Sequence, residues 1–172
     1  VFFDITGDSV YVYNSEVGKM RMMSKWDDDA KRLNLLVKTN LHGNPRFTAT
    51  GYYKPDSTYL NLGASLEDLS VSYFEPFLSG LISKSSGSLS GELFLNGPLD
   101  KLALTGKDCR IKDFRFTLDF TQVPYRIEGP VSLNERGIFF KNLPIYDMYT
   151  GKGSVNGALT YNYFSDVAVD AR

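Results

Sequence analysis

The sequence has very few of the side chains on which most catalytic and metal sites depend. Its 172 residues include one cysteine, Cys109, and one histidine, His42. A single cysteine excludes an intramolecular disulfide and a metal site built from several cysteines. His42 lies within Leu-His-Gly-Asn-Pro at residues 41–45, a sequence typical of a turn. We therefore expect His42 to be a turn residue rather than one half of a catalytic pair.

Sequence motifs of catalysis are also missing. The chain has no glycine-rich phosphate loop, His-Glu-x-x-His, nucleophile elbow or cysteine pair. Three acids follow Trp26 at residues 27–29, but a calcium loop needs spaced oxygen ligands and a glycine, so we expect a solvated turn. A pair of carboxylates brought together by the fold would escape this search. The sequence predicts a protein that is not an enzyme and that needs neither cofactor nor metal.

Neither an excess of one charge nor a long apolar run is present. Lys and Arg number 19 against 20 Asp and Glu, so no basic surface predicts a nucleic-acid partner. No run approaches the ~18 apolar residues of a membrane-spanning helix, and the start lacks the pattern of a signal peptide. The chain starts within one apparent strand and stops directly after another. We expect a single β-rich domain, residues 1–172, cut from a larger protein, with possible sub-halves 1–85 and 86–172.

The sequence is rich in segments where apolar and polar residues alternate, which is the pattern of half-buried strands. Segments 114–120 and 123–133 are the most regular, and segment 32–41 departs from the pattern only at Leu36. Turn residues such as Gly-Asn-Pro at 43–45 and Gly-Pro at 97–98 separate the runs. We expect an all-β fold of about a dozen strands joined as a meander, with helix as a minor component.

One segment breaks the period of two. Phe74, Phe77, Leu78, Leu81 and Ile82 are spaced by three or four residues, and Pro76 is tolerated in a first helical turn. We expect one short helix near residues 74–83. The polar stretch 83–88 that follows would join the two halves, because the same strand pattern continues on both sides of it.

Glycine recurs inside the predicted strands, where it marks a bulge, a bend or a close approach. The clearest case is Gly-Ser-Leu-Ser-Gly-Glu-Leu-Phe-Leu-Asn-Gly-Pro-Leu at residues 87–99, with a weaker echo at 153–160. Such glycines would let a long sheet curve. Alternation alone does not distinguish a long curved sheet from an ordinary β-sandwich, whose core needs the same pattern.

The order of these motifs resembles the conserved C-terminal region of the TamB family, the AsmA-like translocation and assembly proteins of diderm bacteria. The resemblance runs from Ser86 to Asp170. Its motifs are the string at 87–99, Leu-Thr-Gly at 104–106, Tyr-x-x-Glu-Gly-x-Val-x-Leu at 125–133, Ile-Phe-Phe-Lys-Asn-Leu-Pro-Ile-Tyr-Asp at 138–147, Gly-x-Val-x-Gly at 153–157 and Phe-x-Asp-x-x-Val-Asp at 164–170. Residues 1–85 resemble the family only through the strand pattern and Pro-Phe-Leu at 76–78.

The resemblance implies a long, curved, antiparallel-rich sheet folded into a β-taco, an open groove with an apolar interior. It also implies a non-catalytic periplasmic segment of an inner-membrane-anchored protein, with the anchor outside this fragment. Such a groove would serve phospholipid transport between the inner and outer membranes, assembly of outer-membrane proteins, or both. Its partners would be phospholipid acyl chains, the flanking domains of its own chain and an outer-membrane barrel protein of the BamA-like (TamA) type, with no nucleic acid.

If the resemblance holds, the alternating apolar side chains of the second half line the groove. They are Leu89, Leu93, Leu95, Leu102, Leu104, Phe114, Phe116, Leu118, Phe120, Val123, Tyr125, Ile127, Val131 and Leu133. The same side chains would form a plain core if the groove were collapsed.

Two other functions remain open on the sequence. A carbohydrate-binding or adhesive β-sandwich at the cell surface would use aromatic side chains as stacking platforms, namely Tyr11, Tyr13, Tyr52, Tyr53 and Trp26. A chaperone for client polypeptides would differ from a lipid carrier only in its cargo, because open strand edges can pair with an extended chain.

Overall fold

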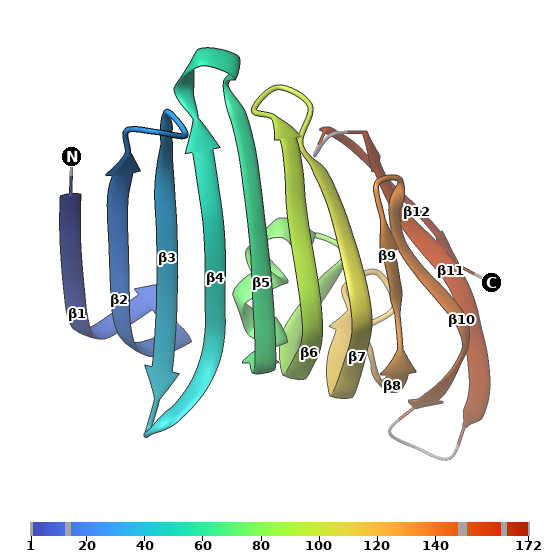
Figure 1. Ribbon diagram of the computed structural model, residues 1–172. Coiled ribbons are helices and arrows are strands. Elements are labelled where there is room, and N and C mark those ends of the chain that lie inside the picture. The colour runs from blue at the N-terminus through green and yellow to red at the C-terminus, as the bar shows by residue number, and fades with distance from the viewer. Residues whose placement is uncertain (1, 13–14, 148–150, 163–164, 172) are drawn as a thin grey trace.

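The computed structural model describes residues 2–12, 15–147, 151–162 and 165–171, which form one antiparallel sheet (Figure 1). Its twelve strands are β1 (Phe2–Val12), β2 (Ser15–Asp27), β3 (Arg32–Leu41), β4 (Asn44–Lys54), β5 (Tyr59–Ser70), β6 (Ile82–Pro98), β7 (Ala103–Leu118), β8 (Val123–Pro130), β9 (Ser132–Asn134), β10 (Gly137–Asp147), β11 (Lys152–Asn162) and β12 (Ser165–Ala171). The strands pair in chain order, except that β8 pairs with β10 and β9 pairs with β10 off this path. The predicted all-β class, the meander and the number of strands are confirmed.

The sheet is open within the described ranges, because β1 and β12 each pair with a neighbour on one side only. Figure 1 shows these two strands at opposite ends of the row. The accessible surface is 10695 Å², whereas a compact monomer of 19.3 kDa would expose about 8,500 Å². The excess is what a sheet without a second sheet packed against it should expose.

The register places most apolar side chains on one face and most polar side chains on the other, because directly paired residues share a face. One row across β2 to β6 is Met22, Val37, Ala49, Ala64 and Leu93. The adjacent row on the opposite face is Arg21, Lys38, Thr48, Ser65 and Glu92. We call these the apolar face and the polar face.

One-residue bulges keep the apolar side chains on the apolar face along the longer strands. Five of the bulges contain a non-glycine residue with φ between 48° and 54°, and these residues are Asp68, Lys84, Asp108, Asp113 and Asn142. Leu66 and Leu69 pair with residues two apart on β6, Gly91 and Leu89, so the bulge between them returns both to one face. The extra residue also increases the local twist of the sheet.

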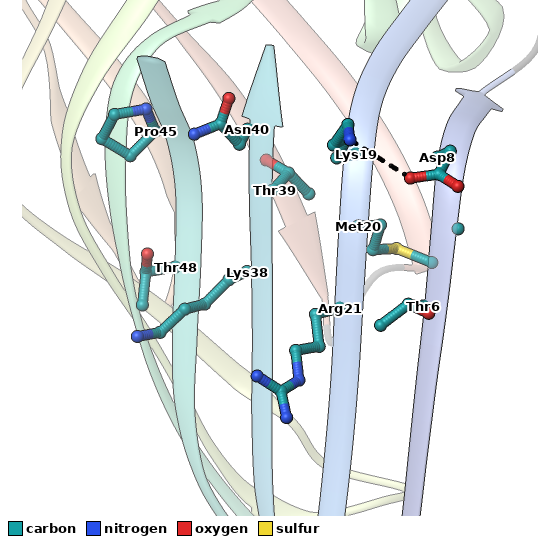
Figure 2. Close-up of a pocket in the computed structure, with 11 residues that line it drawn as sticks. Thr6, Asp8, Lys19, Met20, Arg21, Lys38, Thr39, Asn40, Pro45 and Thr48 are labelled. Carbon is teal, nitrogen blue, oxygen red and sulfur yellow. Dashed lines mark ion pairs between the residues drawn. The ribbon is translucent and has the colours of Figure 1, made fainter. Parts of the chain in front are cut away.

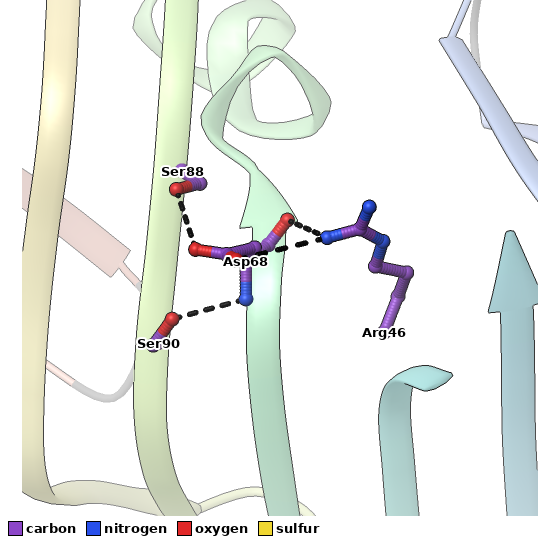
Figure 3. Close-up of polar contacts among 4 residues, drawn as sticks. All are labelled: Arg46, Asp68, Ser88 and Ser90. Carbon is purple, nitrogen blue, oxygen red and sulfur yellow. Dashed lines mark hydrogen bonds and ion pairs between the residues drawn. The ribbon is translucent and has the colours of Figure 1, made fainter. Parts of the chain in front are cut away.

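Side chains on the polar face hold the first of these bulges (Figure 3). The Ser88 hydroxyl donates to the Asp68 carboxylate at 3.1 Å, and the Asp68 N–H donates to the Ser90 hydroxyl at 3.0 Å. The Arg46 guanidinium donates to the Asp68 carbonyl at 3.4 Å. Asp is one of the few residue types that tolerates this left-handed conformation, and these contacts satisfy its polar groups.

The predicted helix begins earlier than expected, is of the 3-10 type and ends before residue 81. It is η2 (Val71–Leu78), and a shorter 3-10 turn, η1 (Pro55–Ser57), lies between β4 and β5. Pro76 lacks an N–H and disfavours the α conformation at Glu75, which favours a short, tight helix. Ile82 is the first residue of β6 and pairs with Leu118 of β7. The stretch 83–88 is therefore part of a strand and not a joining segment, and the boundary between the suggested sub-halves falls inside β6.

Two side chains attach η2 to strands. The Tyr73 hydroxyl donates to the Glu16 carbonyl in β2 at 2.5 Å. The Glu75 carboxylate accepts from the N–H of Ser85 in β6 at 2.7 Å and from its hydroxyl at 2.5 Å. In Figure 1, η2 lies behind the sheet at β5 and β6. The helix therefore links the start of β2 to the start of β6.

Candidate functional site

The candidate functional site is the apolar face. In the C-terminal half this face is closed into a core. The buried members of the core are Cys109, Ile111, Ile127, Val131, Leu133 and Leu143. The Val131 N–H donates to the Cys109 carbonyl at 2.9 Å, at the point where β8 ends and β9 begins. This part of the apolar face is packed against itself.

In the N-terminal half the apolar face is only partly buried: Ala49, Leu66 and Leu69 are buried, and most of its other apolar side chains are half-buried. Its half-buried members include Met22, Leu33, Leu35, Val37, Phe47, Leu60 and Leu62. Ile5 on the outer strand β1 lies opposite Met22 and is 56% exposed. All strands in the described ranges belong to one sheet, so no second sheet covers these side chains. An accessible apolar surface of this kind suits a long ligand held by many weak contacts.

Most of the predicted lining residues lie in or beside the core. Ile127, Val131 and Leu133 are buried members, and partly buried neighbours packed against them are Leu89, Leu93, Leu104, Phe114 and Phe116. Leu95 pairs with Leu62 and Leu104, and Leu118 pairs with Val123 and Ile82. Most of the residues that the sequence predicted as lining therefore share one face of the sheet.

Aromatic rings extend this face along β7 and β8. The Phe114 and Phe116 ring centroids are 4.9 Å apart, and Phe116 and Tyr125 are 6.1 Å apart, each pair inclined by 32°. Phe120 lies outside the strands, in the turn after β7, and is 81% exposed. Leu102 precedes β7 and is half-buried.

The lining set predicted from the sequence omits three residues of the core: Cys109, Ile111 and Leu143. Bulges change the number parity of the apolar positions at these residues. Asp108 and Asp113 shift the apolar positions of β7 from even to odd numbers and back, and Asn142 shifts those of β10 from even to odd. The signal was therefore present as changes of parity within long alternating runs. Leu143 is only 1% exposed, so the most buried apolar side chain lies outside the predicted lining set.

A few titratable groups of the described residues have shifted pKa values, each with a local cause. The Arg21 guanidinium hydrogen-bonds Asp4 and holds the pKa of that carboxyl below its usual value. The Ala30 N–H does the same for Asp27, in the turn that the sequence predicted. Burial raises the pKa of the Cys109 thiol. Among the residues with described positions, no group of three or more His, Cys, Asp or Glu is placed to hold a metal.

The stacking residues of the carbohydrate hypothesis do not gather on one surface. Trp26 and Tyr53 lie on the apolar face on either side of Leu33, whereas Tyr52 lies on the polar face with the Arg32 guanidinium over its ring at 4.7 Å. Tyr11 is on the outer strand and 59% exposed, and Tyr13 lies outside the described residues. His42 is in a turn with φ of 53°.

Comparison with known proteins adds no relative. No family model matches the chain, and no curated protein and no solved structure was found to be similar to it. In the described part of the chain, no helix is long and apolar enough to cross a membrane. The resemblance to the TamB family therefore rests on the order of the sequence motifs.

Proposed function

We propose that this chain is a non-catalytic periplasmic segment of a TamB-like protein, anchored in the inner membrane by another part of its chain. Its sheet folds over the apolar face to form a groove for phospholipid acyl chains. The groove serves phospholipid transport between the inner and outer membranes, assembly of outer-membrane proteins, or both. The observation that carries the proposal is the apolar face itself, which runs across the sheet and includes half-buried side chains such as Leu35 and Leu62 over its N-terminal strands.

The energetics of lipid transfer support an apolar face of this length. An acyl chain in water costs about 0.8 kcal/mol per CH₂, so a whole tail faces a barrier above about 10 kcal/mol. Strands lie ~4.8 Å apart, so a sheet of this size offers a path of about 50 Å. Many equivalent weak contacts lower the barrier without a specific pocket.

Assembly of outer-membrane proteins would use the strand edges. β1 and β12 are each paired on one side only in the described structure. Unpaired edge N–H and C=O groups can take an extended strand from a client or from a barrel protein of the BamA-like type. Both roles need the same sheet and no catalytic residue.

Mass spectrometry of phospholipids that co-purify with the chain tests the proposal. Leu93 lies on the apolar face opposite Ala64 and Gly106, and the next residue, Phe94, lies on the polar face opposite Gly63 and Thr105. Leu93→Asp should reduce the bound phospholipid about fivefold or more, because a carboxylate on the path repels acyl chains. Phe94→Asp places the same charge one residue away and should keep the wild-type amount.

Circular dichroism identifies variants that remain folded, and Leu62→Asn is a milder change on the same face. Wild-type phospholipid content in a folded Leu93→Asp or Leu62→Asn protein would contradict the proposal. Absence of phospholipid from the wild-type protein would do so as well.

A further inference from the structure

A hollow of about 410 Å³ lies over β1 to β4 on the polar face (Figure 2). Its polar lining includes one carboxylate, that of Asp8, together with Thr6, Lys19, Arg21, Lys38, Asn40 and Thr48. Met20 and Thr39 also border the hollow, and the register places their side chains on the apolar face. The floor of the hollow is therefore backbone, and its walls are side chains rich in hydrogen-bond donors.

The cations around this hollow are only partly neutralised. Arg21 is held by Asp4 through two hydrogen bonds, and the Lys19 ammonium lies 3.3 Å from the Asp8 carboxylate. Lys38 is exposed and makes no ion pair within the described ranges. It is paired directly with Arg21 across β2 and β3. Like charges in this position repel each other, and an anion between them would remove the repulsion.

We infer that this hollow binds an oxyanion of the phosphate type. A phosphate group carries close to two negative charges at neutral pH and several strong acceptor oxygens, which suit cations and hydroxyls arriving from different strands. Two of the five guanidinium donors of Arg21 are engaged with Asp4, so the others are available. The phosphate is either free in solution or part of a lipid headgroup.

This site is separate from the acyl path, because it lies on the opposite face of the sheet. It does not follow from a general attraction for anions, since the chain has 19 Lys and Arg against 20 Asp and Glu. Phosphate binding at the hollow is therefore independent of acyl-chain binding on the apolar face.

Titration with inorganic phosphate, followed by nuclear magnetic resonance of the backbone amides, tests the inference. Amide shifts should concentrate in β2 and β3 around the hollow. Lys38→Gln should weaken phosphate binding about fivefold or more, because it removes the unpaired cation. Lys25→Gln is the matched control: this exposed lysine lies on the polar face of β2 and does not line the hollow, so affinity should be unchanged.

For a second pair of variants we expect the opposite effect on phosphate affinity. Asp8→Asn should strengthen binding several-fold by freeing Lys19, whereas Asp28→Asn, with the same change of net charge in the β2–β3 turn, should not. Equal effects of Lys38→Gln and Lys25→Gln, or shifts spread evenly over the sheet, would overturn the inference.

Vesicles identify the source of the phosphate. Binding to equimolar phosphatidylcholine and phosphatidic acid that is lost in Lys38→Gln supports a lipid headgroup. Phosphate binding in solution without vesicle binding supports a free phosphate. Vesicle binding that Lys38→Gln and Lys25→Gln reduce equally, together with no saturable phosphate binding, would overturn the inference.

Discussion

Single residues at the bulges determine how closely neighbouring strands approach. Gly91 in β6 has φ of 141°, and a Cβ built there would lie 2.7 Å from the Cys109 Cα. Gly63 in β5 is different, because a Cβ at that position would meet only the Phe94 ring at 3.6 Å, an ordinary contact. The absence of a side chain is therefore required for close backbone packing at Gly91, whereas Gly63 has room for a Cβ.

Gly91→Ala should lower the free energy of unfolding by about 2 kcal/mol, because it adds a clash in a packed region and strain at positive φ. Gly63→Ala should leave the free energy unchanged or raise it by about 0.5 kcal/mol, since it reduces the freedom of the unfolded chain. Urea unfolding of the two variants measures the difference. Equal stabilities would show that the close approach at Gly91 does not constrain the sheet.

At the scale of the element, one carboxylate, that of Glu75, attaches η2 to β6. Hydrogen bonds from the hydroxyl and the N–H of Ser85 lower the pKa of Glu75. A carboxyl group with a lowered pKa stabilises the fold above the pKa of the unfolded chain, and that stabilisation is lost as pH falls through the lowered value. The contact between η2 and β6 should therefore weaken in acid.

Glu75→Gln keeps an acceptor but cannot titrate. The variant should be less stable than the wild type at pH 7, and the difference should shrink as pH falls below about 4. Asp4 and Asp27 also have lowered pKa values, but they titrate in both proteins and cancel in the comparison. Urea midpoints from neutral to acidic pH measure this, and a constant difference over the range would contradict the role given to Glu75.

The strands and the presence of one short helix were predictable at this scale, and the bounds and type of the helix were not. Side-chain alternation fixes which segments are strands, because a half-buried strand needs it. The three-and-four spacing from Phe74 to Ile82 predicted a longer and later helix, since Leu81 lies in the turn after η2 and Ile82 belongs to β6. Ile82 opens β6 opposite Leu118, a partner that only the tertiary fold provides. The bulge at Asp108 likewise depends on the pairing of β7 with β6.

At the scale of the whole molecule, one apolar face passes from partly exposed strands to a closed core. The lining set chosen from the sequence lies mainly at the core end, with Ile127 and Leu133 buried. Half-buried positions such as Leu35 and Leu62 lie at the other end. Sequence alternation could place all of these on one face. It could not predict which end is closed, because closure depends on how β8 and β9 pack beside β7.

The most direct test of the central claim is photocrosslinking from the apolar face to phospholipid in cells. Leu35 and Leu36 are adjacent, half-buried and identical in type, but they lie on opposite faces, opposite Gly51 and Thr50 in β4. A photoreactive residue at 35 should give a protein–phospholipid adduct in intact-mass spectra, and the same residue at 36 should not. Adducts at neither position, or at both equally, would contradict a lipid path on the apolar face.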